Sequence, residues 1–300
     1  MIVYLLLVIT LLFALLSIFF AWRFTWQGGT QNLHTLALSL SSAMFIYQYG
    51  TWVFISVYVK YIFGICFIIL LLYPFKAKRH KAGSIKVALS LFLALIFFVL
   101  DVLYFTGTTG KPYGVAPLAL PFKTGNYFVF QGGEELPTNV FHYKLRGAVY
   151  AMDIVKLNSM GNRAKHIFST SLQDYEIYND TLYSPCDGRV VKTETRNPDN
   201  IPPSRKRGPS NTNYILLQAG TFNVFMAHLR PGCVFVHEGD TVHTGQPIAC
   251  CGNSGFSLEP HLHIQAHALT AKGVPWYKGK PLMILFNDKF YRLFEVIRTK

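Results

Sequence analysis

The sequence predicts an α-helical transmembrane region followed by a mainly-β domain, and two observations support this division. Residues 1–110 consist largely of long apolar runs and contain seven Lys and Arg against one acid, Asp101, a net charge of +6. Residues 111–300 have an ordinary globular composition, with 21 Lys and Arg against 14 acids, and their apolar residues come in short runs broken by Gly, Pro and Asn. Long apolar runs are typical of membrane helices, and short interrupted runs are typical of strands. We therefore predict a membrane region at residues 1–106, a linker at residues 107–119 and a domain at residues 120–300.

Three apolar stretches in the first part predict three or four transmembrane helices. Residues 1–22 are apolar, without a basic leader or a small-residue cleavage site, which indicates an anchor rather than a removed signal peptide. Residues 36–75 are apolar apart from Lys60, and at about 20 residues per crossing they fit two helices joined near residues 58–60. One long tilted helix with a re-entrant piece is the alternative. The last span is predicted at residues 87–106.

A basic loop before the last span predicts the topology. Cytoplasmic loops carry an excess of Lys and Arg, so we expect this loop inside and the last span to carry the chain out. Everything after Gly107 is then extracytoplasmic, either in a periplasm or at the cell exterior. The basic residues of the loop and its histidine are Lys76, Lys78, Arg79, His80, Lys81 and Lys86.

The second part contains short strands and no long amphipathic helix, which predicts a mainly antiparallel β domain. Glycine turns in residues 236–248, together with residues 184–190, suggest a small β-sandwich of duplicated hybrid (hammerhead) type. A biotinyl or lipoyl carrier domain is the alternative, but no lysine stands on the hairpin where such a carrier needs one. The predicted strands are residues 128–130, 149–154, 214–218, 222–225 and 247–250, with a turn into a strand at 187–191.

The positive charge alone could indicate nucleic-acid binding, but no aromatic-basic platform or binding motif accompanies it, so no nucleic acid is predicted as a partner. Residues 195–212 form a polar insertion with four prolines and the basic run at 205–207. We predict a solvated loop there, with contact to an anionic wall polymer as the alternative.

The cysteines of the second part are not predicted to bind metal, because they lack C-x-x-C spacing. Disulfides are an open alternative if the domain is exported, although the neighbouring Cys250 and Cys251 would point to opposite faces of a strand. The remaining two cysteines of this part are Cys186 and Cys233.

The His-x-His pair at His261 and His263 is the strongest chemical signal in the chain. Alternate side chains of a strand point to the same face, so both imidazoles would enter one site. Neutral imidazole binds zinc and its ordinary pKa suits proton transfer, so one of the pair can hold a metal while the other handles water or substrate. Two histidines in a His-x-His arrangement often occur on a strand by chance, so the pair alone does not establish a site. The evidence for a site comes from three other residues that can join the pair: His142, Asp153 and His228.

The other histidines have no motif around them. His34 and His80 flank membrane segments and are expected to be solvated. Surface or structural roles are predicted for His166, His237, His243 and His267.

An ordered series of motifs over residues 120–290 resembles the lysostaphin/LytM-type zinc metallopeptidases, which are peptidoglycan endopeptidases. The motifs are Asn139-Val-Phe-His142, Tyr150-Ala-Met-Asp153, Ser184-Pro-Cys-Asp-Gly188, Ala227-His-Leu229, Gly239-Asp240, Gly245-Gln246, Gly252-Asn-Ser-Gly255 and Pro260-His-Leu-His263. The resemblance implies that one Zn²⁺ is held by His142, Asp153 and His263. It also implies that His228 and His261 flank the water at the metal as catalytic residues.

One feature departs from the family pattern. Eleven positions separate His142 from Asp153, whereas the shortest family motif separates them by four. Relatives with a Tyr-Ala-x-Asp strand have a longer spacing, and Asn139 is expected to orient His142 from a turn. Two histidines and one aspartate would leave the fourth tetrahedral position of zinc open, as in catalytic rather than structural sites.

Together these observations predict a membrane-anchored zinc metalloendopeptidase that acts outside the cytoplasm on peptidoglycan stem peptides or cross-bridges. Its partners would be peptidoglycan and the lipid bilayer. The alternative from another class is a non-catalytic LytM-like regulator that activates cell-wall amidases or binds division proteins. A peptidase with a different protein substrate is a further alternative.

Overall fold

The computed structural model of the protein describes residues 2–27, 32–73, 83–108, 112–133, 136–143, 147–204 and 208–299. These form two compact units: Met1–Thr106 with Met160–Asn162, and Gly107–Ser159 with Arg163–Lys300. Most of the basic loop used for the topology (residues 76–81) and the basic run at 205–207 lie outside the described residues. The topology derived from that loop therefore stays a prediction.

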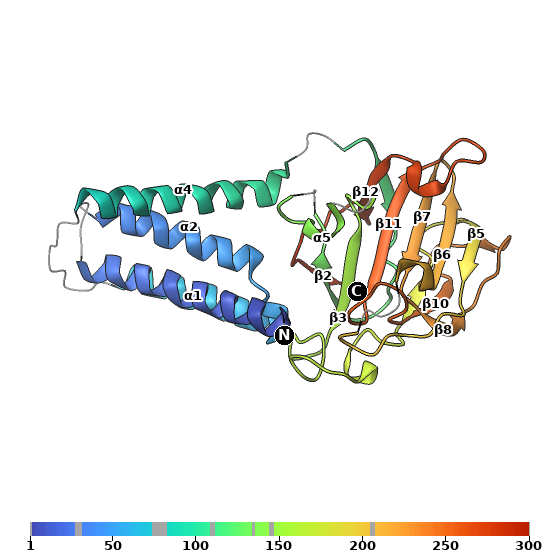
Figure 1. Ribbon diagram of the computed structural model, residues 1–300, viewed down its shortest axis with the longest axis horizontal. Coiled ribbons are helices and arrows are strands. Elements are labelled where there is room, and N and C mark those ends of the chain that lie inside the picture. Colours follow the sequence, from blue (N-terminus) through green and yellow to red (C-terminus); the bar gives the residue numbers. More distant parts are fainter. Residues whose placement is uncertain are drawn as a thin grey trace. The chain divides into compact units, whose positions relative to one another are not determined.

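The first unit consists of helices. Helix α2 packs against both α1 and α4, and Figure 1 shows the three lying alongside one another. Within the described residues, Val3–Trp26 and Ser84–Thr106 are long and apolar enough to cross a membrane, and α3 is apolar but shorter. The helices are α1 (Ile2–Gln27), α2 (Leu33–Tyr49), the 3₁₀ turn η2 (Trp52–Phe54), α3 (Val57–Leu72) and α4 (Ser84–Thr106).

The junction predicted near residues 58–60 is wrong, because those residues lie inside α3. Two capping residues explain where the chain breaks. Gly50 ends α2 with an extended backbone, and its N–H donates to Ile46 O. Ser56 begins α3, and its side-chain oxygen accepts from the Tyr58 N–H at 3.0 Å.

The prediction that His34 is solvated is also wrong, since only 8% of it is exposed. His34, Leu38 and Ser42 follow one another at intervals of four residues, so they share one face of α2. All three are buried. The packing of α2 against two neighbouring helices accounts for this stripe.

The second unit is mainly β, as predicted, and its strands pair almost entirely in antiparallel fashion. In the described residues a ten-stranded sheet has the order β13-β2-β3-β11-β7-β6-β5-β9, with β12 beside β11 and β1 beside β12. A second sheet has the order β4-β10-β8. Only β1 and β12 are parallel among these described pairs. A duplicated hammerhead arrangement stays a prediction.

The strands begin and end as follows: β1 (Val115–Leu118), β2 (Asn126–Gln131), β3 (Met152–Leu157), β4 (Thr181–Tyr183), β5 (Gly188–Glu194), β6 (Tyr214–Ala219), β7 (Phe222–Ala227), β8 (Leu229–Val234), β9 (Thr241–Val242), β10 (Pro247–Cys251), β11 (Leu262–Ala268), β12 (Pro281–Phe286) and β13 (Val296–Arg298). The short helix α5 (Val140–Tyr143) precedes β3. β1 falls within the stretch predicted as a linker and pairs with β12.

The strand predicted at residues 149–154 begins only at Met152. The preceding residues form a turn, in which the Ala151 N–H donates to Ala148 O at 2.9 Å. This turn is held by Asn139, whose side-chain amide donates to the carbonyls of Val149 and Ala151. The site residue Asp153 therefore stands at the second position of the strand.

Strand β11 divides its side chains between two faces. Leu262, Ile264 and Ala266 enter the hydrophobic core of the unit. Because successive side chains alternate, His263 and Gln265 lie on the opposite face. The core thus fixes which residues of β11 face the site.

The insertion at residues 195–212 is only partly the solvated loop that we predicted: several of its described residues are exposed, but Asn200, Pro202 and Thr212 are buried. Asn200 is 3% exposed, and its amide donates to the carbonyls of Gly255 and Ser257 at 2.6 and 3.1 Å. Asn253 donates in turn to Asn200 O at 2.9 Å. The insertion is therefore hydrogen-bonded to the turn that precedes the His-x-His pair.

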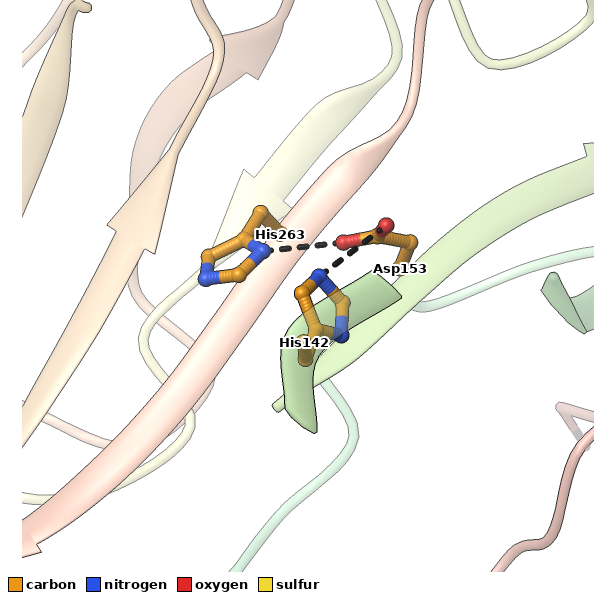
Figure 2. Close-up of side chains that lie close together, drawn as sticks. All are labelled: His142, Asp153 and His263. Atoms are coloured by element: carbon orange, nitrogen blue, oxygen red, sulfur yellow. Dashed lines mark hydrogen bonds and ion pairs between the residues drawn. The ribbon is translucent and has the colours of Figure 1, made fainter. Parts of the chain in front are cut away.

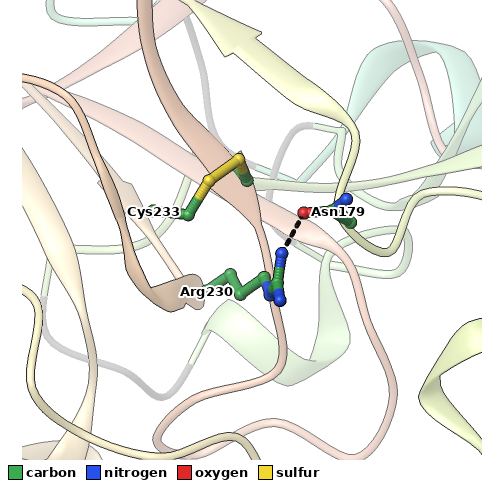
Figure 3. Close-up of a disulfide and its surroundings, with 4 residues drawn as sticks. Asn179, Arg230 and Cys233 are labelled. Atoms are coloured by element: carbon green, nitrogen blue, oxygen red, sulfur yellow. Dashed lines mark hydrogen bonds between the residues drawn. A yellow bond between two sulfur atoms is a disulfide. The ribbon is translucent and has the colours of Figure 1, made fainter.

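A disulfide joins Cys233 on β8 to Cys250 on β10, with the two Cα atoms 5.4 Å apart (Figure 3). The neighbouring Cys251 points the other way, into the hydrophobic core. Figure 3 also shows Arg230, which precedes the bridge on β8 and donates to the side-chain oxygen of Asn179. The sequence left this pairing open.

Candidate metal centre and active site

His142 is held by the residue that begins its helix. Asn139 is fully buried, and its amide nitrogen donates to the carbonyls of Val149 and Ala151 at 2.9 and 3.0 Å. Its side-chain oxygen must therefore face the ring of His142, where it lies 2.9 Å from Nδ1. Nδ1 carries the proton in this arrangement, and Nε2 is directed toward Asp153.

Asp153 and His263 face each other across two neighbouring strands. They are register partners in the antiparallel pair β3–β11, so their side chains project from the same face of the sheet. His263 Nδ1 lies 2.9 Å from Asp153 Oδ1, and His142 Nε2 lies 3.3 Å from Asp153 Oδ2. In Figure 2 a dashed line runs from one nitrogen of each ring to the carboxylate of Asp153.

The donor set of this cluster fits a metal ion. One ligand atom from each of His142, Asp153 and His263 lies within 4.8 Å of the others. Two imidazoles and one carboxylate are ligands that zinc accepts. Each ring turns one nitrogen to the same carboxylate while the other nitrogen faces an amide oxygen.

His261 and His228 join this cluster from two loops. His261 directly precedes β11, and its Nδ1 donates to Glu259 O at 2.8 Å. Its Nε2 lies 3.5 Å from Asp153 Oδ1. His228 lies between β7 and β8, and its Nδ1 donates to Ser254 O at 2.7 Å. The two rings are 4.6 Å apart between centroids.

The backbone of His228 has φ = 64°, a conformation that is uncommon for a residue other than glycine. Such strain costs on the order of 1–3 kcal/mol and persists where surrounding contacts impose it. Here the contact is the hydrogen bond to Ser254 O. The strained turn brings the ring to 5.8 Å from that of His263, between centroids.

The charges of the cluster are strongly coupled. Burial would raise the pKa of Asp153, but the adjacent rings of His142 and His261 outweigh it and hold that pKa well below its usual range. Burial lowers the pKa of His142, but the Asp153 carboxylate raises it further, to a value above the ordinary one. Burial and the nearby rings of His261 and His263 keep the pKa of His228 well below its ordinary value. His228 is therefore neutral near pH 7 and able to accept a proton.

An aromatic row lies beside the cluster on the same side of the sheet. Phe225 on β7 is 6.2 Å from His263 between ring centroids. It stacks on Trp276 at 4.7 Å and contacts Tyr214 at 5.2 Å. This row gives the site an apolar wall.

The structure thus brings together all five residues that the sequence singled out, and their roles stay predictions. Sequence reasoning missed Gln265, which contacts His263 and could have been found as the next residue on the same strand face. It also missed Glu259, which positions His261 and forms a buried ion pair with Arg163 at 2.6 Å. His267 is fully buried, and its Nδ1 donates to Gly279 O at 2.9 Å, away from the cluster.

Comparison with known families identifies part of this domain. Residues 173–276 match the model of Peptidase family M23. The match contains His228, His261 and His263, whereas His142 and Asp153 precede it. The resemblance to LytM-type peptidases is therefore confirmed over this range. No curated protein sequence matches the chain.

Several solved structures are similar at low identity. A zinc containing peptidase from Vibrio cholerae is 22% identical over 36% of this chain and 26% of its own, with a TM-score of 0.26. The catalytic domain of the antimicrobial peptidase lysostaphin from Staphylococcus simulans is 18% identical over 52% of this chain and 86% of its own, with a TM-score of 0.29. The catalytic domain of the prophage-encoded M23 protein EnpA from Enterococcus faecalis is 13% identical over 57% of this chain and 92% of its own, with a TM-score of 0.29.

Proposed function

We propose, from the match of residues 173–276 to Peptidase family M23, that this protein is a membrane-anchored zinc metalloendopeptidase. It hydrolyses peptide bonds in peptidoglycan stem peptides or cross-bridges. The observation that carries the proposal is the convergence of His142, Asp153 and His263 from three separate elements, with one ligand atom of each within 4.8 Å of the others.

The chemistry follows from the side chains around this point. His142 Nε2, Asp153 and His263 Nδ1 would hold Zn²⁺, which when bound supplies a Lewis acid for the scissile carbonyl and lowers the pKa of water. His228 is neutral and its Nε2 carries no proton, so it can accept a proton from the attacking water and return one to the leaving amine.

His261 has a different position in the proposal. Its Nε2 lies beside Asp153, and its Nδ1–H is fixed on the Glu259 carbonyl. This geometry directs the ring to the same point as His228. In its protonated form, the imidazole of His261 can stabilise the negative charge that develops on the carbonyl oxygen of the substrate. The backbone hydrogen bonds of both rings keep them from rotating during the reaction.

The proposed location of the domain outside the cytoplasm rests on its disulfide, and the proposed membrane attachment rests on the helices of the first unit. The Cys233–Cys250 disulfide is typical of oxidising compartments and rare in cytosolic proteins. Helices α1 and α4 carry many exposed large apolar side chains, as expected where helices face lipid. We propose a multi-pass membrane region at residues 1–106, a short connection that begins at residue 107, and an extracytoplasmic peptidase domain that includes β1 (Val115–Leu118).

Membrane attachment suits an immobile polymeric substrate. A tethered domain stays near the wall, so its effective concentration at the substrate exceeds that of a freely diffusing enzyme.

The full chain, reconstituted in nanodiscs with Zn²⁺, is expected to release new amino termini from purified sacculi. Asp153→Ala should remove both zinc binding and release, because it takes away a carboxylate shared by three imidazoles. His243→Ala, which changes an exposed histidine, is the matched control and should be fully active. If Asp153→Ala abolished zinc binding but left the release of amino termini intact, the peptidase proposal would fail. Absence of release by the unchanged protein, together with activation of an added amidase, would favour the regulator instead.

A further inference from the structure

Gln265 is a buried polar residue of β11 that the proposed chemistry does not use. It follows His263 by two positions, so both side chains project from the same face of the strand. It is only 7% exposed. A buried side-chain amide needs hydrogen-bond partners, and its oxygen lies 3.1 Å from Nε2 of His263.

Two acceptors flank the ring of His263 and compete for its proton. The ring has Asp153 Oδ1 at 2.9 Å from Nδ1 and Gln265 Oε1 at 3.1 Å from Nε2. An amide oxygen only accepts hydrogen bonds, so it favours the tautomer with the proton on Nε2. The lone pair of Nδ1 then points to Asp153, which is the side where the candidate ligand atoms gather.

The opposite tautomer would disable the site. With the proton on Nδ1, the ring would donate to Asp153, and Nδ1 could not bind a metal ion. Without a fixed acceptor at Nε2 both tautomers are accessible, and part of the protein would hold His263 in the form that cannot bind. Gln265 gives the Nε2–H tautomer an acceptor of its own and so favours the form that can bind.

The same device holds the other candidate ligand ring. Asn139 Oδ1 accepts from Nδ1 of His142 at 2.9 Å and leaves Nε2 for the carboxylate. Two side-chain amides thus select opposite nitrogens in the two rings, Nε2 of His142 and Nδ1 of His263. In both cases the selected nitrogen is the one beside Asp153.

We propose that Gln265 is a positioning residue that locks His263 in the Nε2–H tautomer and so makes Nδ1 the metal-binding atom. The inference rests on the proposed zinc site, and it adds a residue that touches neither metal nor substrate. Partners that orient a metal-binding histidine typically contribute about 10–100-fold to metal affinity.

The test measures zinc affinity of the full chain in nanodiscs by competition with a chromophoric chelator. Gln265→Leu keeps the approximate size of the side chain and removes the acceptor, so it should weaken zinc binding by about 10–100-fold. Gln265→Glu keeps an acceptor at the same place, so it should bind zinc at least as tightly as the unchanged protein. Gln218→Leu and Gln218→Glu, at an exposed position of β6, are the matched controls and should change the affinity by less than about twofold.

The electronic spectrum of bound Co²⁺ provides a readout that a general loss of stability would not mimic. Gln265→Glu should retain the spectrum of the unchanged protein at saturation, whereas Gln265→Leu should need more Co²⁺ to reach it. Equal zinc affinity of Gln265→Leu and the unchanged protein would overturn the inference, and so would equal weakening by Gln265→Leu and Gln265→Glu.

Failure of the inference is distinguishable from failure of the proposed function. If the unchanged protein binds zinc and loses it on Asp153→Ala, the metal site stands whatever the Gln265 variants do. If the unchanged protein binds no zinc, the proposed function fails first.

Discussion

Asn139→Ala is the substitution that best tests how the site is built. The wild-type side chain is fully buried and makes three hydrogen bonds, two to the carbonyls of Val149 and Ala151 and one to His142 Nδ1. A net contribution of about 1 kcal/mol for each bond gives a loss of about 3 kcal/mol in the free energy of unfolding. For a domain of this size the midpoint of thermal unfolding should fall by about 6–12 °C.

A second variant separates folding from metal binding. Asn139→Asp keeps an oxygen acceptor for His142 but loses both donors and places a carboxylate against two carbonyls. We expect it to destabilise the domain at least as much as Asn139→Ala while zinc affinity falls less. Thermal unfolding of the full chain in nanodiscs, followed by circular dichroism, and chelator competition measure the two quantities. Asn211→Ala, at an exposed position, is the control. An unchanged unfolding midpoint and unchanged zinc affinity of Asn139→Ala would refute this reasoning.

Three further predictions concern redox state, pH and backbone geometry. The cysteines of the Cys233–Cys250 disulfide are 17 positions apart, and its reduction should lower the free energy of unfolding by about 3 kcal/mol. The midpoint of thermal unfolding should therefore fall when reductant is added. The Cys233→Ser variant should unfold at this lower temperature whether reductant is present or absent. Zinc affinity should fall about tenfold per pH unit below the raised pKa of His142, because the metal must displace the proton of that imidazole. Chelator competition between about pH 5 and pH 8 measures this dependence. A zinc affinity that does not change with pH over this range would contradict the prediction. Gly255→Ala should destabilise the domain more than Gly220→Ala in thermal unfolding, since both have positive φ but only at Gly255 does a Cβ overlap neighbouring atoms.

The strands and the site residues were predictable where the signal is local. Short apolar runs marked β2, β6, β7 and β10 because alternation and turn residues are properties of neighbouring positions. The His-x-His pair predicted a shared face for His261 and His263, and both do approach Asp153. Asn139 was expected to orient His142, and their contact is present.

The errors arose where distant segments decide the outcome. A polar, proline-rich stretch is typical of a solvated loop, yet Asn200 finds its partners at Gly255 and Ser257, more than fifty positions away. Composition cannot reveal such pairing. The burial of His34 likewise depends on the neighbours of α2 and not on its own sequence. Gln265 was overlooked because an isolated glutamine on a strand carries no motif.

Strand register joins the fold to the chemistry of the site. Asp153 lies opposite His263 only because β3 and β11 pair in one specific register. A slip by one residue would turn His263 into the core and Ile264 toward the carboxylate, since side chains alternate. The buried residue Ile264 opposes this slip, because the slip would move its side chain out of the core to the polar face. Substitutions in this part of the core should therefore reduce zinc affinity even though none of the substituted side chains touches the site.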